Sequence, residues 1–163
     1  MSLTFPLSFP LSNSLSFGLN AISGVASPME LGANIHLVNA NDMTISPWTA
    51  SGASTFVDGI ADPESGTDAY TFTANAGFPV YFQSVSGFTA GQAISVGAYF
   101  RRRTGTGAVY FLNPDASSKI ITLTSEWQPF LNAGVANGSG VAVWRIMLQT
   151  SGDAIDIFSP RMY

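Results

Sequence analysis

The chain has 163 residues, of which 46% are hydrophobic and only 10% charged, and its formal net charge is −4. Six Lys and Arg residues are too few for a nucleic-acid-binding face, and the absence of cysteine excludes disulfides, zinc–thiolate sites and thiol catalysis. The sequence has no run of about eighteen apolar residues, so it predicts no transmembrane helix. The N-terminus lacks the basic region of a signal peptide. We therefore expect a protein that is soluble, or soluble once assembled, with no nucleic-acid or membrane partner.

Residues 1–19 carry Leu or Phe at the odd positions from Leu3, except for Asn13, and Ser, Thr, Pro or Gly at the even positions. This period of two predicts an extended segment, and Pro6 and Pro10, which cannot donate to a β-ladder, favour an edge strand or a polyproline-like arm. Leaving its large apolar side chains in water would forfeit on the order of 10 kcal/mol. We expect the arm to insert into a partner by strand addition; the alternative is that it packs on its own domain as an edge strand. The partner-binding residues of this arm are Leu3, Phe5, Leu7, Phe9, Leu11, Leu15, Phe17 and Leu19.

Residues 20–34 are rich in Gly, Ser, Ala and Pro and are predicted to be a linker. From residue 35 to 163 the chain alternates between segments rich in Val, Ile, Thr, Tyr and Phe and turn residues, with no convincing helical period. This pattern predicts an all-β domain, a jelly-roll β-sandwich over 35–163 preceded by the extended N-terminal arm. The expected strands are 35–39, 53–57, 68–74, 79–85, 92–102, 108–113, 119–124, 127–134, 140–150 and 154–163.

Alternation within two of these strands predicts which side chains form the core. One face of 140–150 carries no charge, and one face of 92–102 is apolar. These inward sets are Ala142, Trp144, Ile146 and Leu148, and Ile94, Val96, Ala98 and Phe100. Both strands also carry apolar residues on their second face, which favours burial between subunits.

The sequence offers little for catalysis. His36 is the only histidine and lies within a predicted strand, so a structural role outweighs a catalytic triad. No phosphate-binding glycine loop or nucleophile elbow is present. We expect no enzymatic activity and no cofactor. We interpret Asp58, Asp62, Glu64 and Asp68 as turn residues. The alternative is that they bind a structural calcium ion.

Two groups of side chains are candidates for binding. Exposed aromatic rings would suit a glycan, and the aromatics that could contribute are Trp48, Tyr81, Tyr99, Tyr110 and Trp127. Arg101 and Arg103 fall on one face of their strand and Arg102 on the other. They either discourage edge-to-edge pairing or form an ion pair across a subunit contact, so Arg101 and Arg103 are candidate subunit-contact residues.

Five segments resemble a domain of phage structural proteins that is related to carbohydrate-binding jelly rolls. They are NIHLVNANDMTISPWTASGA (34–53), DGIADPESGTDAYTFTAN (58–75), YFQSVSGFTAGQAISVGAYFRRRTG (81–105), SEWQPFLNAG (125–134) and GDAIDIFSPRMY (152–163). The resemblance implies a bacteriophage virion component, such as a capsid decoration protein, a head or tail fibre, or another tail component. It also implies a fold that in related domains often holds calcium.

These observations predict a non-enzymatic structural protein of the virion, anchored to capsid or tail proteins through its arm. We expect a closed homo-oligomer, a trimer being the first choice. The alternative functions are a carbohydrate-binding domain for host surface glycans and a secreted lectin-like module.

Overall fold

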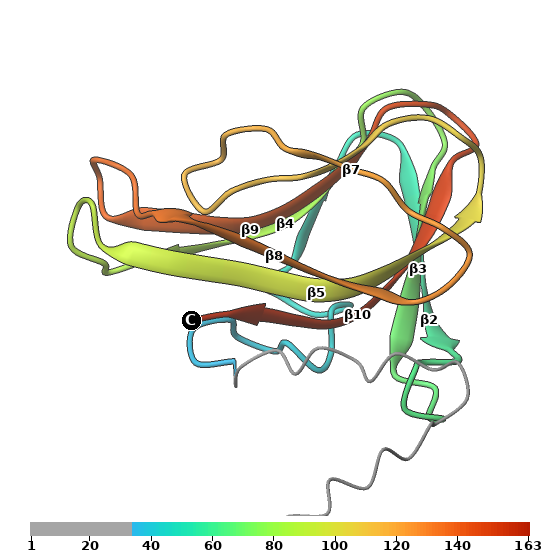
Figure 1. The fold of residues 1–163 in the computed structure, drawn as a ribbon, viewed down its shortest axis with the longest axis horizontal. Helices are drawn as coiled ribbons and strands as arrows, with labels where there is room; N and C mark the ends of the chain where they lie inside the picture. Colours follow the sequence, from blue (N-terminus) through green and yellow to red (C-terminus); the bar gives the residue numbers. More distant parts are fainter. Residues whose placement is uncertain (1–33) are drawn as a thin grey trace, which may run out of the picture.

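A computed structural model describes residues 34–163, so the predicted arm and residues 20–33 of the predicted linker lie outside the described residues. The described chain folds into two antiparallel five-stranded sheets packed face to face (Figure 1). Sheet I has the order β1-β4-β9-β6-β7 and sheet II has the order β2-β3-β10-β5-β8. The strands are β1 (Thr49–Ser51), β2 (Ser54–Ile60), β3 (Ala69–Ala74), β4 (Val80–Ser86), β5 (Ala93–Thr104), β6 (Val109–Phe111), β7 (Ile120–Ile121), β8 (Gln128–Val135), β9 (Val141–Leu148) and β10 (Ala154–Met162).

The predicted jelly-roll β-sandwich is confirmed. Every expected strand after residue 50 overlaps a strand of the structure, because β-branched and aromatic residues in these segments alternate between a buried and an outer face. Within residues 34–163 no helix is long and apolar enough to cross a membrane.

The expected first strand, 35–39, is wrong. Its residues form a bend at His36 and a turn that begins at Val38, where a side chain takes the place of a neighbouring strand. The Gln83 amide accepts from the Val38 N–H and donates to the Val38 carbonyl, both at 2.8 Å. Asn39 then turns the chain with a φ of 52°. The first strand is instead β1, three exposed residues that pair with the edge of β4.

The core lies between the sheets and has Trp144 of β9 near its centre. Trp144 is fully buried, and its indole N–H donates to the Gly97 carbonyl of the opposite sheet at 3.0 Å. Trp48 meets it edge to face, with ring centroids 5.3 Å apart. Both predicted inward sets are confirmed, since all eight of their side chains are buried: Ala142, Trp144, Ile146, Leu148, Ile94, Val96, Ala98 and Phe100.

The segment before β1 runs beside the C-terminal end of β10 (Figure 1). Asn34 accepts a hydrogen bond from the Met162 N–H at 3.1 Å, and the Ile35 N–H donates to the Met162 carbonyl at 3.1 Å. Tyr70 and Tyr81, one from each sheet, donate to the carbonyls of Asn41 and Met43. This segment therefore bridges sheets I and II rather than extending either.

Candidate functional site

The outer face of sheet I carries aromatic, apolar and basic side chains that are not part of the core. Residues of β4, β6 and β9 that alternate with buried ones point outward here. Phe82, Tyr110, Arg145 and Met147 are each half-buried on this face. We name these four residues the sheet I platform.

Phe82 and Arg145 form the centre of the platform. They lie directly opposite each other on β4 and β9, and the Arg145 guanidinium carbon lies 5.2 Å from the centroid of the Phe82 ring. This is cation–π geometry. The Arg145 Nε is buried and has no hydrogen-bond partner among the described residues. The three ion pairs found within residues 34–163 use Arg101, Arg102 and Arg103 instead.

A second row of the platform lies two residues along the strands. Met147 of β9 pairs with Tyr110 of β6, and Tyr110 pairs with Ile120 of β7, which is 62% exposed. Strand spacing and rise per residue place Phe82 and Tyr110 about 12 Å apart, with β9 between their strands. Two rings at this separation, with a guanidinium beside the first, form an extended surface rather than a closed pocket.

The outer face of sheet II holds the predicted subunit-contact residues. Arg101 and Arg103 project to the same side of β5, and their Nε atoms donate to Asp156 of β10 at 2.7 and 2.8 Å. Thr71 donates its hydroxyl to the same carboxylate at 2.6 Å. Burial opposes the ionisation of Asp156, but these hydrogen bonds from Arg103, Thr71 and Arg101 outweigh it and hold its pKa below the usual value.

The observed ion pairs of Arg101 and Arg103 are thus within the chain, and a subunit contact for them stays a prediction. Arg102 points to the other side of β5 and contacts Asp153 at 3.5 Å, as alternation predicts. Arg101 also lies over the Trp127 ring, 4.7 Å from its centroid. Its guanidinium is therefore held on two sides by residues of its own domain.

The aromatics considered for glycan binding separate into different environments. Trp48 and Tyr81 are buried in the core and Tyr99 is buried on the outer face of sheet II, whereas Trp127 and Tyr110 are half-buried. Of these five, Tyr110 belongs to the platform. The reasoning from sequence missed Phe82 and Arg145 as site residues. Alternation was the signal for both residues. The residues next to them in sequence are assigned to the core or are buried, which places Phe82 and Arg145 on the outer face of the sheet.

The other residues that the sequence offered as candidates make contacts within the fold. His36 lies in the turn segment with its ring edge-on to Phe88, the centroids 4.9 Å apart. Asp62 accepts hydrogen bonds from the backbone N–H groups of Glu64, Gly66 and Asp68, which close the loop between β2 and β3. Partial burial raises the pKa of Asp62, but these hydrogen bonds lower the pKa by more, so that it lies below the usual value. Within residues 34–163 no group of three or more His, Cys, Asp or Glu side chains gathers to hold a metal ion.

Comparison with solved structures identifies the class of fold. The TmCBM61 module, solved in complex with β-1,4-galactotriose, superposes with a TM-score of 0.59 at 18% identity, over 81% of this chain and 99% of that module. The CBM22-1 xylan-binding domain of Paenibacillus barcinonensis Xyn10C superposes with a TM-score of 0.55 at 12% identity, over 82% of this chain and 96% of that domain. The structural neighbours are thus carbohydrate-binding-module jelly rolls.

A phage protein shares the same fold. The enzymatically active domain of tailspike protein 4 from bacteriophage CBA120 superposes with a TM-score of 0.55 at 12% identity, over 79% of this chain. The match spans only 21% of that tailspike chain. No family model and no curated protein matches this sequence. At these identities the comparisons establish the jelly-roll fold alone, and function has to be argued from the site.

Proposed function

We propose that residues 34–163 form a non-enzymatic carbohydrate-binding domain that holds a glycan chain across the sheet I platform. The observation that carries this proposal is the pair Phe82–Arg145: a half-buried ring with a guanidinium carbon 5.2 Å from its centroid, both on the outer face of sheet I. A sugar offers apolar C–H faces for a ring and hydroxyl oxygens for N–H donors. The platform presents both kinds of group side by side.

The extent of the platform suits a chain of sugars rather than a single one. Phe82 and Tyr110 are about 12 Å apart by strand geometry, which exceeds the width of one pyranose ring. The exposed hydroxyls of Thr49 and Ser84 flank Phe82 along β1 and β4. The likeness of the fold to modules solved with or named for bound polysaccharides supports the same function.

A glycan array probed with the full chain tests this proposal. We expect binding to at least one class of oligosaccharide, lost in Phe82→Ala and kept in the matched control Phe78→Ala. Phe78 is 57% exposed, lies in the loop before β4 and is not one of the four platform residues. Equal loss in both variants, or binding unaffected by Phe82→Ala, contradicts the proposed site.

A second function is compatible with the first. We propose that residues 1–19 anchor the domain to other virion proteins or to neighbouring copies, so that the carbohydrate-binding domain is displayed on a phage particle. The alternation of Leu and Phe with Ser, Thr and Pro in this segment supports the proposal, as does the fold that the domain shares with part of a phage tailspike. Because the arm lies outside the described residues, its test is the deletion described in the Discussion.

A further inference from the structure

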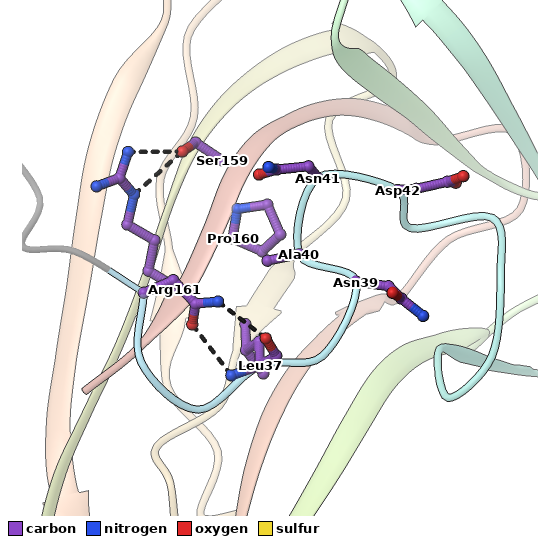
Figure 2. Close-up of a pocket in the computed structure, with 9 residues that line it drawn as sticks. Leu37, Asn39, Ala40, Asn41, Asp42, Ser159, Pro160 and Arg161 are labelled. Atoms are coloured by element: carbon purple, nitrogen blue, oxygen red, sulfur yellow. Dashed lines mark hydrogen bonds between the residues drawn. The ribbon is translucent and has the colours of Figure 1, made fainter.

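A cavity lies between the segment before β1 and the C-terminal end of β10, and it uses none of the platform residues. Its volume is about 610 Å³, and a second hollow of about 280 Å³ adjoins it. Both are lined by Ala40, Asn41, Ser159 and Arg161. Figure 2 shows the larger of the two. The larger volume falls within the range of small-molecule sites, roughly 300–1,000 Å³.

The wall formed by residues 39–42 is fixed by side chains from both sheets, which bond to it or to the residue next to it. Gln83 makes two hydrogen bonds to Val38. The Trp48 indole donates to the Asn39 carbonyl at 2.9 Å, and the Tyr70 hydroxyl donates to the Asn41 carbonyl at 3.0 Å. Because this wall is held before any ligand arrives, binding requires little ordering of the chain.

The opposite wall is an irregularity in β10. The pairing of β10 with β5 shifts between Phe158 and Arg161, and Ser159 has a φ of 52°. A non-glycine residue with positive φ is uncommon and strained, and bulges of this kind re-aim side chains beside functional sites. Here the bulge brings Ser159 to the cavity, where its Oγ accepts from the Arg161 Nε and Nη2 at 3.1 and 2.9 Å.

The polar groups of the cavity match a polyhydroxyl ligand. The exposed Asn41 side chain points toward Ser159 in Figure 2, and Glu64 and Asp68 line the adjoining hollow. An amide both donates and accepts, a carboxylate accepts, and a guanidinium donates, so a sugar hydroxyl finds both kinds of partner. Asp42 also lines the larger cavity, and three carboxylates against one guanidinium disfavour an anionic ligand, because like charges brought together are unfavourable.

From this geometry we propose that the cavity is a second saccharide-binding site that takes a single neutral sugar unit or the end of a neutral chain. Asn41, Ser159 and Arg161 bind its hydroxyls, and Asp42, Glu64 and Asp68 set the preference for uncharged sugars. The sheet I platform, by contrast, would hold a longer segment of glycan. The two sites share no residue, so either one can exist without the other.

An NMR titration of the ¹⁵N-labelled full chain tests the second site. The neutral probes are galactose, glucose and N-acetylglucosamine, and the charged probe is glucuronate. We expect at least one neutral sugar to shift the backbone amides of residues 39–42 together with Ser159 and Arg161. Asn41→Ala should weaken this binding at least tenfold, and glucuronate should bind at least tenfold more weakly than the neutral sugar.

Two control variants separate this site from the platform. Gln149→Ala removes an exposed amide elsewhere and should leave the affinity unchanged, and Phe82→Ala should leave the shifts at residues 39–42 in place. No shift at the cavity with any neutral probe, shifts that persist unchanged in Asn41→Ala, or equal binding of glucuronate overturns the second site. If glycan binding depends on Phe82 but no sugar shifts the amides around the cavity, only the second site is overturned. If shifts occur only around the cavity, only the platform site is overturned.

Discussion

Phe82 and Arg145 face each other across β4 and β9, with the guanidinium carbon 5.2 Å from the ring centroid. Both side chains point away from the core that Gln83 and Trp144, their neighbours in sequence, help to form. Sheet I thus presents a ring and a cation on its outer side, away from the core. This relationship is the basis of the proposed glycan site.

Loss of the Phe82 ring should weaken glycan binding strongly. Stacking of one aromatic ring on a ligand is worth about 1–3 kcal/mol in the related case of nucleic-acid bases, so Phe82→Ala should raise the Kd for the best array glycan about 10- to 100-fold. Titration calorimetry on the full chain measures this change. The affinity of Phe78→Ala should match that of the unaltered protein, and a loss in both variants would point to general destabilisation instead.

Replacement of Arg145 should separate binding from stability. A buried donor without a partner destabilises a fold by about 1–3 kcal/mol, so Arg145→Met, which keeps an extended side chain beside Phe82, should leave the free energy of unfolding unchanged or raise it by about 1 kcal/mol. The same variant should lose glycan binding. Urea denaturation and calorimetry measure the two effects, and a variant that is less stable but binds normally would show that Arg145 is structural.

Stability should depend on pH through Asp156. Because the pKa of Asp156 in the folded protein lies below its usual value of 3.8, ionisation of this carboxylate stabilises the fold above pH 3.8, and the contribution is lost as the pH falls through the lower folded value. Asp156→Asn should therefore lower the free energy of unfolding by about 2 kcal/mol at pH 7, and the difference should shrink below pH 3.8. Urea denaturation at several pH values measures it. Asp58→Asn, at an exposed position, is the control, and a difference that stays constant across pH contradicts the role assigned to Asp156.

The segment before β1 should loosen when Gln83 is replaced. Gln83→Leu keeps most of the buried volume but removes both hydrogen bonds to Val38, each worth about 1 kcal/mol. We expect faster hydrogen exchange at the Val38 amide and weaker sugar binding in the cavity, with little change at the centre of β5. Unchanged exchange at Val38 would show that other contacts hold the segment, and Gln149→Leu provides the comparison at an exposed glutamine.

The arm can be tested by deletion of residues 1–24. If its Leu and Phe side chains are buried at a subunit contact, the full chain should form a closed oligomer in light scattering and the deletion variant should be a monomer that remains folded by circular dichroism. The same variant should fail to join virus particles. Identical masses for the two proteins, or normal incorporation of the deletion variant, would remove the arm from any role in assembly.

Sequence reasoning predicted the sandwich because alternation is a property of each strand alone. The inward face of β9 and that of β5 follow from which alternate positions lack charge, and both are buried. The absence of a strand at 35–39 escaped prediction because the Val38 backbone pairs with the Gln83 side chain, 45 residues away, which no local pattern records. Nor could alternation show that Ser159 interrupts β10, since the bulge depends on pairing with β5.

The candidate site could be predicted only in part from the sequence, because it too depends on pairing between distant segments. Tyr110 was among the aromatics considered, but Phe82 and Arg145 become neighbours only through the pairing of β4 with β9. Arg101 and Arg103 looked like contact residues because three consecutive arginines are unusual in a chain with six Lys and Arg residues. Their nearest partner, Asp156, lies more than 50 positions further along the chain.

A crystal structure of the full chain with the best oligosaccharide from the array tests the central claim most directly. We predict a sugar ring stacked on Phe82, with further sugar units extending toward Tyr110 and a ligand oxygen within hydrogen-bonding distance of the Arg145 guanidinium. A saccharide bound elsewhere while the Phe82–Arg145 pair stays bare would contradict the account.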